Sequence, residues 1–319
     1  MVTAHECAQL LSLTPVRTKQ ILKEMYEEEI IRTSANGKIK VTHSQIRGLI
    51  ELRGAKYKQT TAVIGMEKGG VGKSLLTCNV AIKKAQLGAR VLVIDLDPES
   101  CATNLLLDDD HVGTDYKTIL EILSNNLNFK DAILPTRFEG LDLIPCKGRA
   151  RRADRYIRDE NLGSLYKNKM EGLFDIYDLI LFEVPPTFSN IIASAYISSE
   201  MVIMPTFPDS WSLESVMLTL EDIKEECDKW SVPVPKINVL LNKYRPDRSA
   251  SKDAWNVLIN DFSDMVLPFQ IRESADLQNA INEGKSIFEI RASKVVKESI
   301  TELADFICPL SQPEKHIHH

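Results

Sequence analysis

The sequence predicts an α/β protein in which a mostly parallel, doubly wound sheet lies between helices, preceded by a small helical module. Short unbroken apolar runs alternate with helical segments from residue 60 onward, which is typical of parallel strands buried on both faces. A glycine-rich segment lies between the first such run and a helix. The charge changes at the same place, because residues 1–59 hold ten Lys and Arg against six Asp and Glu, whereas the whole chain carries −6.

The chain has 319 residues, of which 44% are hydrophobic and 26% charged. That length predicts about two domains, and the composition is ordinary for a globular protein. No apolar stretch approaches the ~20 residues of a membrane helix, and the N-terminus lacks the basic start and apolar run of a secretory signal. We therefore expect a cytoplasmic protein with no membrane partner. Its six widely spaced cysteines include no C-x-x-C pair, so no zinc or iron–sulfur site is expected.

Residues 1–54 form the predicted N-terminal domain. A helix over His5–Leu13, a turn at Thr14-Pro15 and a helix over about Val16–Glu29 precede a hairpin with Asn36-Gly37 at its turn. This order is typical of a winged helix-turn-helix domain that binds DNA. Basic side chains that could contact DNA phosphates lie at the start of the second helix and on the hairpin: Arg17, Lys19, Lys38 and Lys40. A packing or dimerisation domain without DNA contact remains the alternative.

The second domain is predicted over 55–310, after a polar, basic linker at 53–59 and before a disordered tail at 311–319. A helix over Lys73–Leu87, closed by Gly88, follows the first strand, and the last helix spans Ser293–Ile307. Strands are predicted over Thr61–Met66, Arg90–Ile94, Leu179–Val184, Met201–Pro205 and Lys236–Asn242.

A phosphate-binding loop (P-loop) is predicted between the first of these strands and its helix, in the segment Glu67-Lys68-Gly69-Gly70-Val71-Gly72-Lys73-Ser74. Glycines let backbone N–H groups converge on phosphate oxygens, and the helix N-terminus adds positive potential. Lys73 is predicted to reach the β- and γ-phosphates and the Ser74 hydroxyl to bind Mg²⁺. The predicted nucleotide-binding residues of the loop run from Lys68 to Leu75.

Glu67 stands where an ordinary P-loop has its first glycine, and an additional lysine, Lys68, follows it. With this deviant Walker A pattern the chain resembles the ParA/MinD family of dimeric P-loop ATPases over roughly residues 60–307. The resemblance implies ATP or ADP with Mg²⁺ as ligands and a weak Mg²⁺-dependent ATPase activity. It also implies that Lys68 crosses the interface of a homodimer to the partner's nucleotide, as an arginine finger does.

Two further segments resemble the family in the same order. Val91–Glu99 resembles V-L-L-I-D-x-D-P-Q, which implies a place near the metal for Asp95 and a role for Asp97 in placing the attacking water. Tyr177–Pro186 resembles the Walker B region, with Glu183 where Asp is expected. We expect Glu183 to hold a Mg²⁺-bound water. Because its side chain is one methylene longer and a shift of ~1 Å can cost ~100-fold in rate, slow hydrolysis is an open alternative.

Weaker matches follow at strand ends, where plain loops are the alternative interpretation. Asn242-Lys243, and Pro268 between Leu267 and Phe269, resemble adenine-side segments of the family, and Met204–Pro208 with a helix from Ser212 resembles its interface segment. The N-terminal module makes the chain similar to the longer plasmid ParA proteins. That resemblance implies non-specific DNA binding by the ATP-bound dimer, with these candidate contacts: Lys243, Arg245, Arg248, Lys285, Arg291, Lys294 and Lys297.

The function favoured by the sequence is a DNA-segregation (plasmid partition) ATPase, nucleoid-associated and stimulated by a ParB-type partner, that represses its own operon through residues 1–52. The rival is a nucleotide-gated transcription repressor whose ATPase fold is only a dimerisation switch, and Glu183 supports it. A positioning ATPase acting on a protein cargo is a third interpretation.

Overall fold

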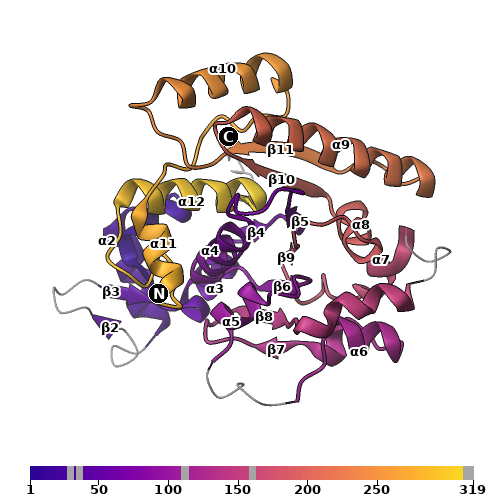
Figure 1. The fold of residues 1–319 in the computed structure, drawn as a ribbon. Coiled ribbons are helices and arrows are strands. Elements are labelled where there is room, and N and C mark those ends of the chain that lie inside the picture. Colours follow the sequence, from indigo (N-terminus) through magenta and orange to yellow (C-terminus); the bar gives the residue numbers. More distant parts are fainter. Residues whose placement is uncertain (27–31, 34–38, 109–114, 158–162, 312–319) are drawn as a thin grey trace, which may run out of the picture.

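A seven-stranded sheet forms the centre of the protein in a computed structural model that describes residues 1–26, 32–33, 39–108, 115–157 and 163–311 (Figure 1). The strand order is β11-β10-β5-β9-β6-β8-β7, and each neighbouring pair is parallel except β7 with β8. The predicted α/β class with a mostly parallel sheet is confirmed. The strands are β5 (Thr60–Ile64), β6 (Val91–Asp95), β7 (Leu134–Pro135), β8 (Leu141–Ile144), β9 (Leu179–Glu183), β10 (Met201–Thr206) and β11 (Lys236–Leu241).

Successive strand residues point to opposite faces of the sheet and enter two separate hydrophobic cores. Ala62 and Ile64 lie in one core, whereas Val63 lies in the other. The helices of the first core in this part of the chain are α4 (Lys73–Gln86), α5 (Cys101–Leu106), α11 (Ala275–Asn282) and α12 (Lys294–Ile307). The second core contains residues of α6 (Ile119–Ser124), α7 (Leu165–Lys169), α8 (Asn190–Ile197), α9 (Ser210–Trp230), α10 (Ser249–Phe262) and the 3-10 helices η3 (Phe129–Ala132) and η4 (Gly148–Tyr156).

The N-terminal module combines α1 (Ala4–Leu10), α2 (Pro15–Met25) and α3 (His43–Leu52) with a small antiparallel sheet. The order of that sheet is β1-β3-β2, from β1 (Val2–Thr3), β3 (Ile39–Val41) and β2 (Arg32–Thr33). The Thr14 side chain caps α2 by accepting the Arg17 backbone N–H at 3.2 Å, and Pro15 stands in the first turn, as the sequence predicts. The predicted turn at Asn36-Gly37 and residue Lys38 lie outside the described residues, and the sequence did not predict α3 or β1.

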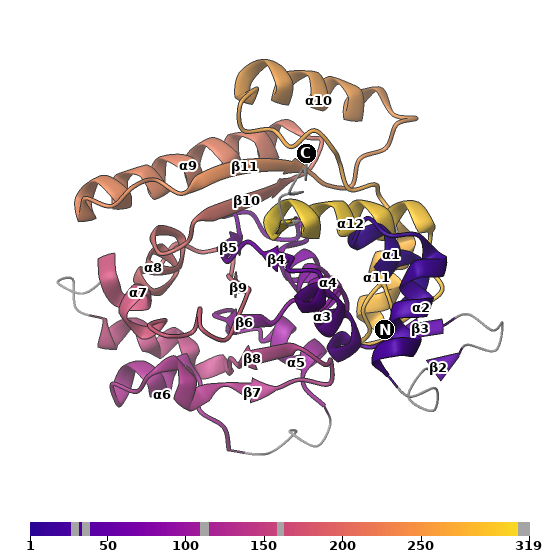
Figure 2. The same ribbon diagram turned by 180° about the vertical axis from the view of Figure 1, so that it is seen from behind.

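The module shares its core with the rest of the chain. Ile46 and Leu49 of α3 belong to the same cluster of buried side chains as Leu76 and Val80 of α4. Figures 1 and 2 show the indigo N-terminal helices beside α11 and α12. The predicted linker contains β4 (Lys56–Tyr57), which pairs antiparallel with β12 (Leu310–Ser311) and so joins the two ends of the predicted second domain. Ser311, predicted from the sequence to belong to the disordered tail, therefore lies in a strand.

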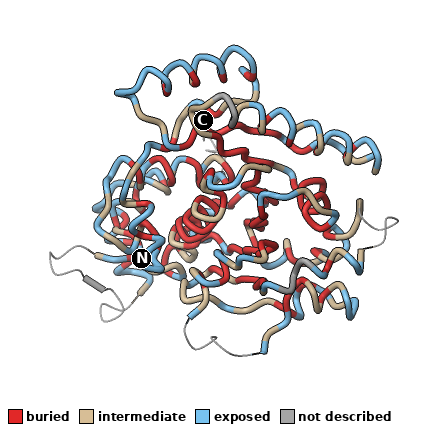
Figure 3. The backbone as a smooth tube through the Cα atoms, in the orientation of Figure 1, coloured by how far each residue is buried: buried red, intermediate tan, exposed pale blue. Residues whose placement is uncertain are grey.

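Helix α4 is buried along most of its length, and Figure 3 shows it as one of the red segments at the centre of the molecule. It begins at the predicted residue, Lys73, and Gly88 ends it in the left-handed conformation with φ of +86°. None of the described helices is long and apolar enough to cross a bilayer.

Replacing Gly88 tests how closely α3 packs against the end of α4. A methyl group at Gly88 would lie 2.9 Å from Ile46 Cγ2 and 3.1 Å from the Arg47 nitrogen, in addition to the strain of a positive φ. Gly54→Ala supplies the control, because Gly54 has φ of +64° but nothing within 4 Å of an added methyl. We expect Gly54→Ala to lower the free energy of unfolding by ~1 kcal/mol and Gly88→Ala by at least ~1 kcal/mol more, measured by urea unfolding. Equal losses would contradict this packing.

Candidate functional site

The glycine-rich loop between β5 and α4 has the backbone shape that its sequence predicts. Gly70 and Gly72 adopt φ of +74° and +96°, which favours glycine. A methyl group on Gly72 would lie 2.7 Å from the amide nitrogen of Asn242, the residue that follows β11. That amide donates to the carbonyl oxygen of Val71 at 2.8 Å. The loop is therefore held from outside by a side chain 171 positions away, and Gly72 makes room for it.

Lys73 lies at the N-terminus of α4 with its ammonium turned into the loop. Its Nζ donates to the carbonyl oxygen of Lys68 at 2.8 Å. Burial lowers the pKa of Lys73, and the nearby carboxyl groups of Glu183 and Asp97 oppose that shift. The loop thus combines a buried cation, glycines and a helix N-terminus, which together favour an anionic ligand such as a phosphate.

Glu183 ends β9 and is completely buried. Among the described residues, neither of its carboxyl oxygens has a hydrogen-bond partner, and neither has the buried Thr77 hydroxyl. Burial, followed by repulsion from Asp95, raises the pKa of Glu183 to about 8, while the neighbouring Ser74 and Thr77 hydroxyls oppose the rise. An unpartnered buried carboxyl is unfavourable. It fits a hard divalent cation, which prefers oxygen donors, so Ser74 and Glu183 fit Mg²⁺.

Asp95, the last residue of β6, and Asp97, two residues later, lie in different environments. The Asp95 carboxylate accepts the Thr103 N–H and hydroxyl at 2.9 and 2.7 Å and the Asp97 N–H at 2.9 Å. Burial nevertheless raises the pKa of Asp95 to about 6. Asp97 accepts the Glu99 N–H at 2.8 Å and lines two neighbouring cavities. Asp97 therefore has access to a bound ligand, whereas Asp95 orders the loop that carries Asp97.

A cavity of about 1140 Å³ opens over the loop. Among the predicted nucleotide-binding residues, those in its wall are Gly69, Gly70, Gly72, Lys73, Ser74, Leu75 and Asn242. Of the predicted set that the structure describes, Lys68, Val71 and Pro268 lie outside the wall. Sequence reasoning missed other residues of the cavity wall, which include Cys101 and Leu105 from α5 and Arg272, Ser274, Leu277 and Gln278 in and before α11.

Lys68 projects toward α9 and forms an ion pair with Asp209, Nζ to Oδ1 at 3.0 Å. The preceding residue is also held by this helix, since the Glu67 N–H donates to the Thr219 hydroxyl at 3.2 Å. Contacts with Asp209 and with Thr219 of α9 therefore hold Glu67 and Lys68, the first two residues of the loop, in addition to the bond from Lys73 to the Lys68 carbonyl.

The predicted DNA-contacting residues fall into two groups. In the N-terminal module, Arg17 and Lys19 are exposed on α2 and Lys40 is exposed on β3. In the predicted second domain, Lys243, Arg248, Lys285, Arg291 and Lys294 are exposed, and Arg245 and Lys297 are half-buried. Five of these seven cations make contacts within the described chain. Their partners are Asp247 and Glu273 for Arg245, Glu283 for Lys285, Glu298 for Lys294, the Ile290 carbonyl for Lys297 and the Phe207 ring for Lys243.

The chain is similar in sequence to a protein family and to several known proteins. Residues 59–231 match the family model AAA_31, described as an AAA domain. The chain is 25% identical over 245 residues to the cell division protein PomZ of Myxococcus xanthus, covering 76% of each protein. It is 24% identical over 264 residues to the virulence plasmid ParA family protein pGP5-D of Chlamydia muridarum, covering 80% of this chain and 94% of that protein.

A solved structure with a similar fold is the septum site-determining protein MinD of Pyrococcus horikoshii complexed with Mg-ADP. The two chains superpose with a TM-score of 0.61 at 21% identity, over 78% of this chain and 96% of that one. The likeness shows a shared fold.

Removing the Asn242 amide tests whether it holds the loop in its binding shape. We expect Asn242→Ala to weaken the binding of a fluorescent ADP analogue about tenfold, since a buried hydrogen bond contributes roughly 1–1.5 kcal/mol. Asn238→Ala is the matched control, because Asn238 is buried in β11, the strand that Asn242 follows, and among the described residues its amide donates to the Lys236 carbonyl. Equal affinities in the two variants would exclude this role for Asn242.

Proposed function

The chain belongs to the AAA_31 family of AAA domains, and we propose that it is an ATP-dependent plasmid-partition ATPase. In this proposal two copies close face to face on ATP, the ATP-bound dimer binds DNA without sequence preference, and a ParB-type protein stimulates hydrolysis and release. The relatives support it, because one is a cell division protein and another is a ParA family protein of a virulence plasmid.

The observation that carries the proposal is the pairing of a P-loop with a buried carboxyl that lacks a partner within the described chain. Lys73 and Ser74 of α4 line the cavity, and Glu183 of the adjacent strand β9 is buried beside the Ser74 and Thr77 hydroxyls, so one cation and two kinds of oxygen donor lie close together. This donor set fits ATP or ADP with Mg²⁺. The solved MinD structure of similar fold is complexed with Mg-ADP, which supports the assignment.

The residues of the site have distinct proposed roles. The backbone N–H groups of the loop bind phosphate oxygens, and the Lys73 ammonium exchanges the Lys68 carbonyl for a phosphate oxygen. When Mg²⁺ is bound, Ser74 would be its direct ligand and Glu183 would hold a metal-bound water. Bound Mg²⁺ supplies neutralisation of the negative charge on the phosphates. Asp97, which lines the cavity, orients the attacking water.

Lys68 is proposed to act across the dimer interface. In one copy it pairs with Asp209, whose side chain is 41% exposed. Water screens an ion pair whose carboxylate is this exposed, so the pair contributes little free energy. Lys68 can therefore leave Asp209 for the nucleotide of a neighbouring copy at a small cost in free energy.

The N-terminal module is proposed to bind operator DNA and repress the protein's own operon. Two observations support a winged helix-turn-helix: α1 and α2 are joined by a short turn, and the sheet β1-β3-β2 places a hairpin beside them. Arg17 and Lys19 lie on the exposed face of α2, which would be the recognition helix.

The second candidate function is a nucleotide-gated repressor without partition activity. It is favoured by Glu183, since a longer carboxylate in the Walker B position can slow hydrolysis while leaving nucleotide binding intact.

Two lysine variants test the partition proposal. Lys73→Ala is expected to abolish nucleotide binding, because it removes the cation that faces the phosphates. Lys68→Ala is expected to bind nucleotide with wild-type affinity but to remain monomeric with ATP, measured by analytical ultracentrifugation with ADP and with a non-hydrolysable ATP analogue. ATP-dependent dimers of Lys68→Ala would exclude the proposed role of Lys68.

A further inference from the structure

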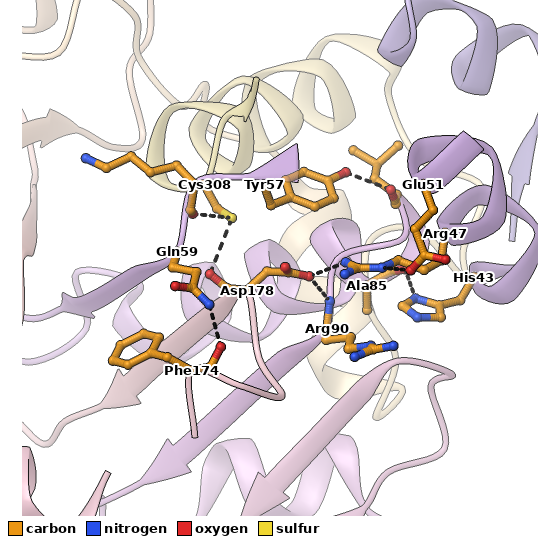
Figure 4. Close-up of polar contacts among 12 residues, drawn as sticks. His43, Arg47, Glu51, Tyr57, Gln59, Ala85, Arg90, Phe174, Asp178 and Cys308 are labelled. Carbon is orange, nitrogen blue, oxygen red and sulfur yellow. Dashed lines mark hydrogen bonds and ion pairs between the residues drawn. The ribbon is translucent and has the colours of Figure 1, made fainter. Parts of the chain in front are cut away.

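Side chains from the N-terminal module and the linker cap the carboxyl end of α4 (Figure 4). The imidazole Nδ1 of His43 lies 2.8 Å from the Ala85 carbonyl oxygen, and the Tyr57 hydroxyl donates to the Leu87 carbonyl oxygen at 2.7 Å. The last carbonyl groups of a helix have no donors from the next turn, so such bonds from outside stabilise the helix end. The Ala85 carbonyl oxygen also accepts the Gly88 N–H at 2.9 Å, so His43 and Tyr57 add contacts that attach the end of α4 to the module and to the linker.

Two lysines in the last turn of α4 extend this attachment. Lys83 Nζ lies 3.0 Å from Glu6 Oε1 of α1, and Lys84 Nζ lies 3.0 Å from Asp305 Oδ1 of α12. The lysine side chains are only 5% and 0% exposed, so water screens their charges poorly and each needs its carboxylate. Cations in the last turn are also favoured by the helix dipole.

A third contact joins α3 to the beginning of β9. Arg47 Nη1 lies 2.6 Å from Asp178 Oδ2, and the same oxygen accepts the Arg90 backbone N–H at 2.8 Å. The Arg47 and Asp178 side chains are 23% and 14% exposed, so this pair is also sheltered from solvent. Asp178 directly precedes β9, and its carbonyl oxygen accepts the N–H of Thr60 at the start of β5.

The module thus contacts the far ends of the two elements that carry the site. Helix α4 has Lys73 and Ser74 at its first turn and Lys83 in its last, about 15 Å apart along the axis at 1.5 Å per residue. Strand β9 has Asp178 before its first residue and Glu183 as its last. Both elements are buried and closely packed, so a tilt at one end displaces the other end.

We propose that Glu6–Lys83, His43–Ala85 and Arg47–Asp178 form a junction through which the nucleotide site and the N-terminal module control each other. The inference rests on the proposed function for its ligand, ATP or ADP. A bound nucleotide that moves the first turn of α4 and the Glu183 end of β9 also moves the opposite ends of α4 and β9. This movement changes how the N-terminal module packs against them. Because such coupling is reciprocal, DNA bound to α2 changes nucleotide affinity by the same factor.

Hydrogen exchange of the full-length protein tests the junction. Peptides within residues 2–25 and 43–52 are followed by mass spectrometry without nucleotide, with Mg-ADP and with a non-hydrolysable ATP analogue, and the affinity for each nucleotide is measured separately. In the wild type we expect at least one nucleotide to change the exchange rates of these peptides by ~5-fold or more, the lower end of typical coupling.

Arg47→Ala is expected to bind nucleotide but to lose this nucleotide-dependent difference. Arg90→Ala is the matched control, because Arg90 gives Asp178 only its backbone N–H, which the variant keeps. If Arg47→Ala does not fold, Glu6→Gln replaces it, since glutamine can still accept the Thr3 N–H that caps α1 but presents no charge to Lys83.

The outcomes separate the junction from the function on which it rests. Wild-type protein that binds nucleotide with unchanged exchange in the module overturns the junction and leaves the proposed ATPase standing. A full nucleotide response in Arg47→Ala or Glu6→Gln also overturns it. Wild-type protein that binds no nucleotide overturns the proposed function and the junction together.

Discussion

The burial of α4 is the constraint on which the rest of the structure depends. A buried helix needs partners for the N–H groups of its first turn and the carbonyl groups of its last. At the N-terminus of α4 the glycine-rich loop leaves those N–H groups facing a cavity, where an anion can accept them. At the C-terminus His43 and Tyr57 supply donors, and Glu6 and Asp305 neutralise the lysines. The P-loop at one end of α4 and the N-terminal module at the other thus both supply contacts that a buried helix end needs.

The order of the strands explains the electrostatics of the site. β9 lies between β5 and β6, so Glu183 at its carboxyl end lies between the P-loop and Asp95. Carboxyl ends of parallel strands meet at one edge of a sheet, and here this concentrates acidic groups in a buried place. The Thr103 N–H and hydroxyl donate to Asp95, whereas the Glu183 oxygens have only the Ser74 and Thr77 hydroxyls nearby and no hydrogen bond among the described residues, and Glu183 takes the larger rise in pKa. The fold therefore holds an unfavourable carboxyl where a cation would relieve it.

The sequence predicts the elements whose signals are long or chemically distinctive. The apolar runs, the glycine-rich loop and Gly88 predict β5, β6, β9, β10, β11 and α4 to within two residues at each end, whereas the parallel strand β8 was not predicted. The two-residue strands β1, β4 and β12 are too short for any periodic pattern. Helix α3 carried a usable signal that was missed, because Thr42 and Gln45 have the spacing of a capping box and form one.

The residues of the site, like the secondary-structure elements, are predictable where they belong to a distinctive motif. Lys73, Ser74 and Glu183 lie within or beside recognisable motifs, but Arg272 and Leu277 reach the cavity from positions about 200 residues from the P-loop, which only the tertiary fold shows. The Arg47–Asp178 contact spans 131 positions and has no local signature. By contrast, the pairing of Lys294 with Glu298 could have been predicted from its i,i+4 spacing.

Binding to a random-sequence DNA duplex tests the central claim most directly. The protein is measured without nucleotide and with ADP, ATP and a non-hydrolysable ATP analogue at two salt concentrations. The partition account predicts binding only with ATP or the analogue, weakening with salt at a log–log slope of about −0.9 for each phosphate neutralised. Binding that is absent throughout, or indifferent to nucleotide, would contradict that account and favour the nucleotide-gated repressor.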